Sequence, residues 1–176
     1  VNPGQERRVY LSDVGSKIVP ENIGDPIIGA SMGMAPNESY WAAESSEMEF
    51  HPNCYNIIYL GKNNQIFKST DGGTLFSAIH TGGSGNTVTY IEVSRDRPEV
   101  QYAVLRTSGS CLLVKTENEW ATSTVLSTPI STSKALIALD PSNDNNIWIA
   151  FPYGSNGSKV YRSIDGGTNW TQINNN

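Results

Sequence analysis

The stretch KSTDGGTLF at residues 68–76 decides the fold, because it returns as RSIDGGTNW at residues 162–170. Ser163 lies 94 residues after Ser69, which is twice 47. Two copies at this separation indicate an internal repeat, because self-similarity at a fixed period marks repeat architectures. A third copy is therefore expected halfway between them.

A diverged copy occupies that position. Residues 113–120, LVKTENEW, keep a basic residue, a hydroxyl residue and a closing aromatic residue, but they lose the Asp-Gly-Gly turn. Lys115 lies 47 residues after Lys68 and 47 residues before Arg162. Equal spacing with a changed turn indicates one structural unit whose middle copy has drifted.

Short apolar segments with the character of β-strands precede each copy. They form two series, at residues 48–50, 91–93 and 137–139, and at residues 57–60, 102–105 and 147–150. Together with the strands on either side of the turn, each repeat contains four short strands. A repeat of about 40–50 residues with four strands is typical of a β-propeller blade. One such sheet alone would expose two apolar faces, and stacking against neighbours buries both.

We therefore predict an all-β fold, a partial β-propeller of about three to three and a half four-stranded antiparallel blades. Residues 1–46 are expected to hold the end of a preceding blade plus an insertion. The predicted blades cover residues 47–88, 89–134 and 135–176, and the middle one carries the degenerate turn. The remaining blades of the ring are expected from the same longer chain or from another chain, and a symmetric pair of half-rings is one form of the second alternative.

The Asp-Gly-Gly segments lie between strands and predict hairpin turns, because glycine adopts positive φ freely and Asp accepts hydrogen bonds from nearby backbone N–H groups. They resemble the Asp-box, or BNR repeat, whose pattern is Ser/Thr-x-Asp-x-Gly-x-Thr-Trp. Leu75 and Asn169 stand where that family usually has Thr. The matching residues are Ser69, Asp71, Gly73 and Phe76 in one copy, and Ser163, Asp165, Gly167 and Trp170 in the other.

This resemblance places residues 47–173 in the β-propeller superfamily that includes sialidases, xyloglucanases and sortilin-like receptors. In that superfamily the box is a structural turn on the outside of the propeller, away from the central cleft where ligands bind. The resemblance implies that Asp71 and Asp165 are structural residues and not catalytic acids. It identifies the architecture and leaves the function open.

Composition excludes some classes of function. The net charge of −5 and the sequence pI near 5.0 argue against nucleic-acid binding, which needs a basic surface. No apolar run approaches the ~18 residues that span a bilayer. The composition, rich in Asn and Thr, is typical of extracellular or cell-surface proteins of the secreted bacterial kind. Cys54 and Cys111 fall at non-equivalent repeat positions, and both a disulfide bond and two free thiols stay open.

Other motifs predict no cofactor and no metal site. Residues 140–146 alternate oxygen-bearing side chains but lack the Gly and Glu of a calcium loop, so they indicate a turn. The glycine-rich residues 82–85 lack the Lys of a phosphate-binding loop and indicate a connection between blades. Arg95 and Arg97 are interpreted as solvated turn charges.

The leading functional hypothesis is a non-catalytic propeller module of a secreted or cell-surface protein, which acts as a scaffold or as a binding platform for protein or carbohydrate. It rests on clear evidence for the architecture and on the lack of a coherent catalytic set. Tyr40, Trp41, Phe151 and Tyr153 are candidates for a surface on which sugars stack, with burial between blades as the alternative for each.

The alternative is part of a glycoside hydrolase, which needs two carboxyl groups across the scissile bond. The segment YLSDVG at residues 10–15 loosely resembles the one that carries the nucleophilic Asp of xyloglucanases. That resemblance makes Asp13 the catalytic candidate, although Ser16 stands in place of the family's second Gly. A sialidase is disfavoured, because no Arg-Ile-Pro motif opens an arginine triad.

Overall fold

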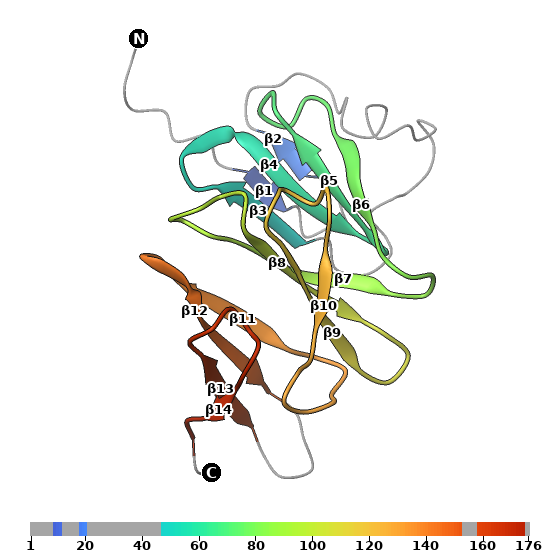
Figure 1. The fold of residues 1–176 in the computed structure, drawn as a ribbon. Helices are drawn as coiled ribbons and strands as arrows, with labels where there is room; N and C mark the ends of the chain where they lie inside the picture. Colours follow the sequence, from blue (N-terminus) through green and yellow to red (C-terminus); the bar gives the residue numbers. More distant parts are fainter. Residues whose placement is uncertain (1–8, 12–17, 21–46, 153–157, 175–176) are drawn as a thin grey trace.

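The computed structural model describes residues 9–11, 18–20, 47–152 and 158–174. These residues form strands and turns, with no helix among them. The strands build one two-stranded sheet and three four-stranded sheets, all antiparallel. The three larger sheets follow one another from the top to the bottom of Figure 1. The predicted all-β fold with four-stranded antiparallel units is confirmed.

Each four-stranded sheet takes its strands in chain order. The small sheet pairs β1 (Val9–Leu11) with β2 (Ile18–Pro20). The first sheet contains β3 (Glu47–His51), β4 (Cys54–Lys62), β5 (Gln65–Ser69) and β6 (Ser77–Thr81). The second contains β7 (Thr87–Val93), β8 (Gln101–Arg106), β9 (Cys111–Thr116) and β10 (Thr124–Leu126). The third contains β11 (Leu136–Asp140), β12 (Asn143–Phe151), β13 (Lys159–Ser163) and β14 (Thr171–Gln172).

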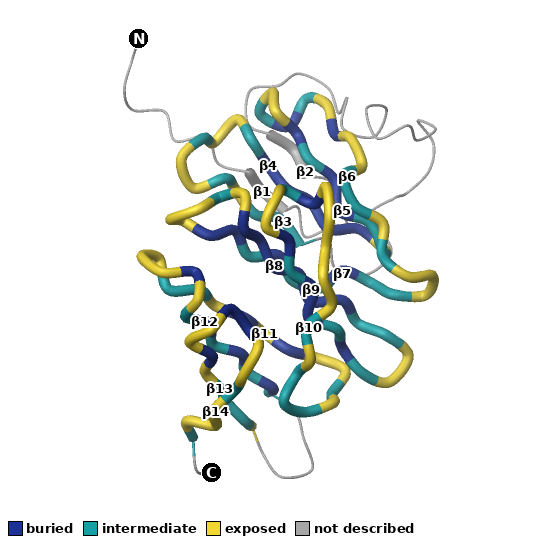
Figure 2. Tube along the Cα trace, in the orientation of Figure 1, coloured by how far each residue is buried: buried dark blue, intermediate teal, exposed yellow. Residues whose placement is uncertain are grey.

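The second sheet buries both of its faces, as stacked blades require. Ala103 and Leu105 of β8 pack with Tyr59 and Ile66 of the first sheet. The alternate β8 residues Tyr102 and Val104 pack with the third sheet through Ile147, Ile149 and other residues of β12. Because successive side chains of a strand point to opposite faces, β8 is apolar along most of its length. Figure 2 shows β8 as a largely dark, buried strand.

The first strand of each sheet lies on the inside of the arrangement. β7 contacts β3 and β4 of the sheet before it and β11 of the sheet after it. The last strands are exposed: all described residues of β14 and two of the three residues of β10 face solvent. In a propeller the inner strands surround the central channel, and β3, β7 and β11 hold that position in the three described sheets.

Candidate functional site

The first Asp-box hairpin, between β5 and β6, is held by its own side chains. The Ser69 hydroxyl donates to Asp71 Oδ1 at 2.8 Å and accepts the Gly73 N–H at 2.8 Å. Asp71 Oδ1 also accepts the Leu75 N–H at 2.9 Å. Two glycines follow the acid, and both have positive φ, 75° at Gly72 and 93° at Gly73. This backbone conformation explains the Asp-Gly-Gly sequence, because side chains with a Cβ rarely adopt it.

The second Asp-box hairpin, between β13 and β14, repeats these contacts. The Ser163 hydroxyl donates to Asp165 Oδ1 at 2.7 Å and accepts the Gly167 N–H at 2.9 Å. Asp165 accepts the backbone N–H groups of Thr168 and Asn169 at 3.1 and 2.8 Å. The Asn169 side chain adds a bond to Asp165 Oδ2 at 2.7 Å. Both motif carboxylates therefore direct their hydrogen bonds into their own turns.

These contacts lower the pKa of both motif acids and so favour their ionised forms. Hydrogen bonds from Asn169 and Ser163 hold the pKa of Asp165 at about 2. Desolvation opposes the shift at Asp71, but bonds from Leu75 and Ser69 still lower its pKa. A general acid needs a pKa near the working pH. Neither residue has that property.

The middle hairpin, between β9 and β10, keeps the same bonds with different residues. Thr116 takes the place of the motif Ser: its hydroxyl donates to Asn118 Oδ1 at 3.0 Å and accepts the Trp120 N–H at 2.8 Å. Asn118 takes the place of the motif Asp and accepts the Thr122 N–H at 2.8 Å. Glu119 and Trp120 have φ of 52° and 72°, in the positions of the two glycines. The sequence interpretation of Trp120 as the closing aromatic residue is therefore wrong, since its backbone occupies the second glycine position.

Side chains of the middle turn reach the first sheet. Glu119 accepts a hydrogen bond from the Tyr59 hydroxyl at 3.1 Å and pairs with Lys68 at 2.8 Å. The buried Trp120 ring lies 4.9 Å from His80 of β6, and its N–H donates to Gln101 at 2.7 Å. The turn is thus a contact between blades as well as a hairpin.

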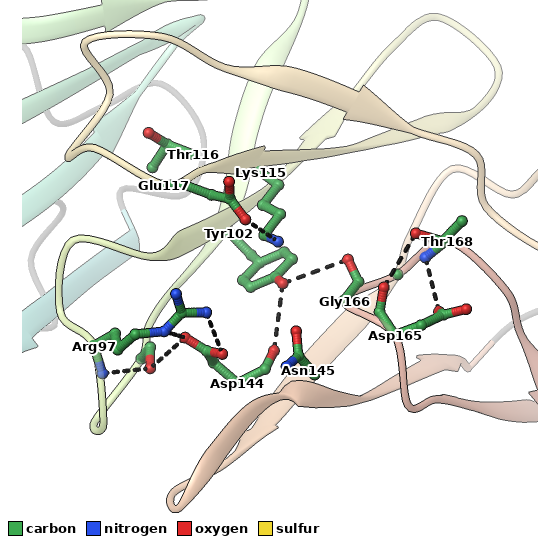
Figure 3. A network of polar contacts seen from close by, with 12 residues as sticks. Arg97, Tyr102, Lys115, Thr116, Glu117, Asp144, Asn145, Asp165, Gly166 and Thr168 are labelled. Carbon is green, nitrogen blue, oxygen red and sulfur yellow. Dashed lines mark hydrogen bonds and ion pairs between the residues drawn. The ribbon is translucent and has the colours of Figure 1, made fainter.

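A second polar network joins the second and third sheets (Figure 3). Arg97 donates two hydrogen bonds to Asp144, at 2.8 and 2.9 Å, and the Asp144 side chain is only 3% exposed. The Tyr102 hydroxyl lies 3.4 Å from the Asp144 carbonyl oxygen and 3.5 Å from that of Gly166. Arg97 is thus exposed in its loop, as predicted for a solvated turn charge, and it also pairs with a buried carboxylate of the next sheet.

The closing aromatic residues of the two Asp-boxes lie in different surroundings. Phe76 is buried with Ile58, Leu60 and Phe67 in the first sheet. Trp170 is half-buried against the apolar cluster between the second and third sheets, and its N–H donates to the Ser127 carbonyl oxygen at 3.1 Å. Both rings therefore pack beside the hairpins that they close.

Acidic side chains gather on the inner strands, and we call Glu47, Glu49, Tyr90 and Glu92 the inner-strand acid face. Burial raises the pKa of Glu92 to about 7, with a further contribution from the negative charge of Glu49. Burial and the charge of Glu49 likewise raise the pKa of Glu47, and burial raises that of Glu49. The Leu139 backbone of β11 opposes this rise in the pKa of Glu92. Perturbed carboxyl groups that interact with one another are typical of functional sites, and this face is the candidate binding site.

Sequence reasoning missed this face. The sequence predicts the strands that carry Glu49 and Glu92, but no motif marks their carboxylates. One signal was present: Glu49 lies ten residues before Tyr59, and Glu92 lies ten residues before Tyr102. This spacing places each acid opposite an aromatic residue across a β hairpin.

The remaining candidates from the sequence are the proposed sugar-stacking residues and the catalytic candidate Asp13. Phe151 is completely buried between the second and third sheets, so of its two predicted alternatives burial between blades is the one observed, and sugar stacking is not. Asp13, Tyr40, Trp41 and Tyr153 lie outside the residues whose side chains the structure describes.

Cys54 and Cys111 are both free thiols, and Cys111 is buried. Within the described ranges, no group of three or more His, Cys, Asp and Glu residues is arranged to hold a metal ion. The described strands and turns also include no helix that could cross a membrane.

Known structures share this fold, although no protein-family model and no curated protein matches the chain. A GH74 enzyme of Niastella koreensis is 25% identical with a TM-score of 0.58, over 71% of this chain and 22% of its own. The GH74 xyloglucanase of Xanthomonas campestris is 17% identical with a TM-score of 0.56, over 72% of this chain and 21% of its own. YCF48 bound to D1 peptide is 16% identical with a TM-score of 0.54, over 72% of this chain and 39% of its own.

These neighbours are β-propeller proteins, and this chain spans about a fifth of the length of the GH74 enzymes and about two fifths of YCF48. Three consecutive four-stranded sheets with matching hairpins account for the likeness. The chain shares the β-propeller fold of these proteins.

Proposed function

We propose that this chain is a non-catalytic propeller module of a secreted or cell-surface protein, a scaffold that binds protein or carbohydrate at the inner-strand acid face. The assignment of Asp71 and Asp165 as structural turn residues is part of this proposal. It is supported by the confinement of their hydrogen bonds to the hairpins.

The observation that best supports a binding role is that the inner strands bring several acidic side chains together. Glu49 raises the pKa of Glu92, so the two carboxylates repel each other when both are ionised. A cationic group placed between them relieves this repulsion and is bound more tightly as they deprotonate. Carboxylates and the Tyr90 hydroxyl also offer hydrogen-bond partners for sugar hydroxyls. The face therefore fits a basic protein segment or a hydroxyl-rich carbohydrate.

The test is calorimetric titration of the intact protein with a Lys/Arg-rich peptide and, separately, with xyloglucan oligosaccharides. A basic peptide should bind more tightly as the pH rises through about 7, because Glu92 then loses its proton. A neutral oligosaccharide should lack this dependence. Glu92→Gln should weaken binding of either ligand, while the exposed Glu99→Gln serves as the matched control. Failure of both ligands to bind, or equal binding by both variants, contradicts the proposed site.

A glycoside hydrolase is the second candidate. The pKa of Glu92 near 7 favours it, because a carboxyl group with a raised pKa is suited to protonate a leaving group. The fold shared with GH74 enzymes points the same way. The discriminating assay is hydrolysis of β-glucans and sialosides by the intact protein. Hydrolysis that is abolished by Asp13→Asn or by Glu92→Gln would overturn the non-catalytic proposal.

A further inference from the structure

A cation and an aromatic ring face each other in the same place in all three sheets. Lys68 lies 5.8 Å from the centre of the Tyr59 ring, and Lys115 lies 5.8 Å from that of Tyr102. In the third sheet, the Arg162 guanidinium lies 5.2 Å from the centre of the Trp148 ring. In every case the cation on the third strand pairs across the sheet with the ring on the second strand.

The first two pairs are covered by the hairpin turn of the following sheet. Tyr59 is fully buried, and Glu119 of the second sheet binds both its hydroxyl and Lys68. Tyr102 is also fully buried under the third sheet, where its hydroxyl faces the carbonyl oxygens of Asp144 and Gly166. Lys115 reaches the same turn: its Nζ lies 3.2 Å from the position that a Cβ would take on Gly166.

These two interfaces share one chemistry. In both, the ring hydroxyl faces an oxygen atom of the following turn. Lys68 also pairs with the Glu119 carboxylate of that turn, whereas Lys115 pairs with Glu117 of its own hairpin. Trp148 and Arg162 also combine a donor on the ring with a cation, because the indole N–H is a donor and the guanidinium offers five N–H groups. Trp148 and Arg162 could therefore bind a turn that presents hydrogen-bond acceptors, as the earlier pairs do.

The third pair is not covered in this way. Trp148 is only half-buried and Arg162 is exposed, in contrast with the fully buried Tyr59 and Tyr102. Apolar residues continue the face around it: Leu136 is 42% exposed, and Ala138 lies opposite Trp148 on β11. We call Leu136, Ala138, Trp148, Val160 and Arg162 the third-sheet open face.

We propose that the third-sheet open face binds a further four-stranded blade of the same propeller, whose hairpin turn between its third and fourth strands presents oxygen atoms to Trp148 and Arg162. Continuity with the two established interfaces specifies the occupant, since each earlier sheet receives such a turn in this position. The length of the relatives supports a blade of the same propeller, because this chain covers 22% of the GH74 enzyme and 39% of YCF48. The three described four-stranded sheets also fall short of the four or more blades that close a ring.

The test is hydroxyl-radical footprinting of the intact propeller protein, read residue by residue by mass spectrometry. Each labelling rate is divided by the rate of the same residue in the denatured protein. Tyr59 and Tyr102 give the value for covered rings, and Tyr55, which is 76% exposed, gives the value for an open ring. We expect Trp148 to be protected several-fold relative to Tyr55, to the level of Tyr59, and independently of protein concentration.

The second part of the test reverses the charge of Arg162. Arg162→Glu should repel the acceptor oxygens of the incoming turn, so the protection of Trp148 should be lost. Arg95→Glu, at an exposed arginine in the loop before β8, should leave that protection intact. Unchanged protection of Tyr59 and Tyr102 shows that the three described sheets remain folded in both variants.

Three results overturn the proposal. Labelling of Trp148 at the normalised rate of Tyr55 in the intact protein means that no blade covers the face. Protection that disappears on dilution means that a second copy of the protein covers it. Protection that survives Arg162→Glu means that oxygen atoms of a turn are not what the pair binds.

Discussion

The hairpins of the second and third sheets form the same hydrogen bonds from different residues. In the third sheet two glycines, Gly166 and Gly167, hold the left-handed backbone positions, with φ of 69° and 91°. In the second sheet Glu119 and Trp120 hold them, with φ of 52° and 72°. A residue with a Cβ costs about 1–2 kcal/mol in such a conformation. The middle hairpin is therefore strained where the other one is relaxed.

The strained residues make contacts that glycine cannot make. Glu119 binds Tyr59 and Lys68 of the first sheet, and Trp120 buries a large ring beside His80. Gly166 offers its neighbour only a backbone carbonyl oxygen, which Tyr102 approaches at 3.5 Å. The two turn positions therefore affect both the backbone geometry of the hairpin and the packing between blades. In the diverged middle turn, a less favourable backbone conformation is accompanied by additional contacts with the neighbouring blade.

The largest expected effect is at Trp120. Trp120→Gly should relax the backbone but lose the buried ring and its bond to Gln101, for a net loss of about 3 kcal/mol in the free energy of unfolding. Trp120→Ala should lose about 1 kcal/mol more, because alanine keeps the strain. Urea unfolding followed by circular dichroism measures both. A Trp120→Gly variant as stable as the parent would contradict the packing role.

The reverse exchange in the third sheet should be nearly as costly. Gly167→Ala forces a Cβ to within 2.7 Å of Leu126 at a φ of 91°, so we expect a loss of about 2–3 kcal/mol. Gly73→Ala is the matched control: it has a similar φ of 93°, but its nearest side-chain contact would be 3.4 Å away. The control should lose about 1–2 kcal/mol. Equal losses in urea unfolding would mean that the contact with Leu126 carries no cost.

Glu119 separates backbone strain from side-chain contact. Glu119→Ala loses the contacts with Lys68 and Tyr59 but keeps the positive φ, whereas Glu119→Gly loses the contacts and relaxes the backbone. The glycine variant should therefore be about 1 kcal/mol more stable than the alanine variant. Thermal unfolding of the two proteins measures the difference. An alanine variant at least as stable as the glycine variant would show that this turn is not strained.

The smallest expected effect is a difference between the two hairpins in how their stability depends on pH. The folded pKa of Asp165, about 2, lies below its ordinary value of 3.8, so its ionised form stabilises the fold above pH 3.8. That contribution should disappear as the pH falls from 3.8 towards 2. Asp165→Asn should accordingly be less stable than the parent at pH 7, and the gap should close towards pH 2. Substitution of Asn118, which does not titrate, by Ala should give a gap with no such pH dependence.

The repeat period predicted most of the fold. A spacing of 47 residues placed four strands in each unit, and the pairing of β3 to β14 in three sheets agrees. Gly73 and Gly167 have φ of 93° and 91°, which few other residues adopt. The Asp-Gly-Gly segments could therefore be recognised as turns from the sequence. The prediction for Trp120 was wrong because it is an aromatic residue like Phe76, although it lies three positions earlier in its turn than Phe76 does.

The candidate site was less accessible to sequence reasoning. Glu92 acquires its raised pKa from burial and from Glu49, which is 43 residues away in sequence and lies on another sheet. Arg97 pairs with Asp144 across the next interface, and Phe151 is buried in that interface. Each property depends on how neighbouring sheets pack, and a repeat pattern within one blade does not contain that information.

The most direct test of the docking between blades is a double-mutant cycle on Lys68 and Glu119, with Lys68→Met and Glu119→Gln measured singly and together by urea unfolding. The pair is partly buried, with side chains 18% and 37% exposed and 2.8 Å apart, so we predict a coupling of about 1 kcal/mol. The same cycle on Lys115 and the exposed Glu117, within one hairpin, should give a smaller value. Additive effects of Lys68→Met and Glu119→Gln would contradict the claim that the middle turn binds the first sheet.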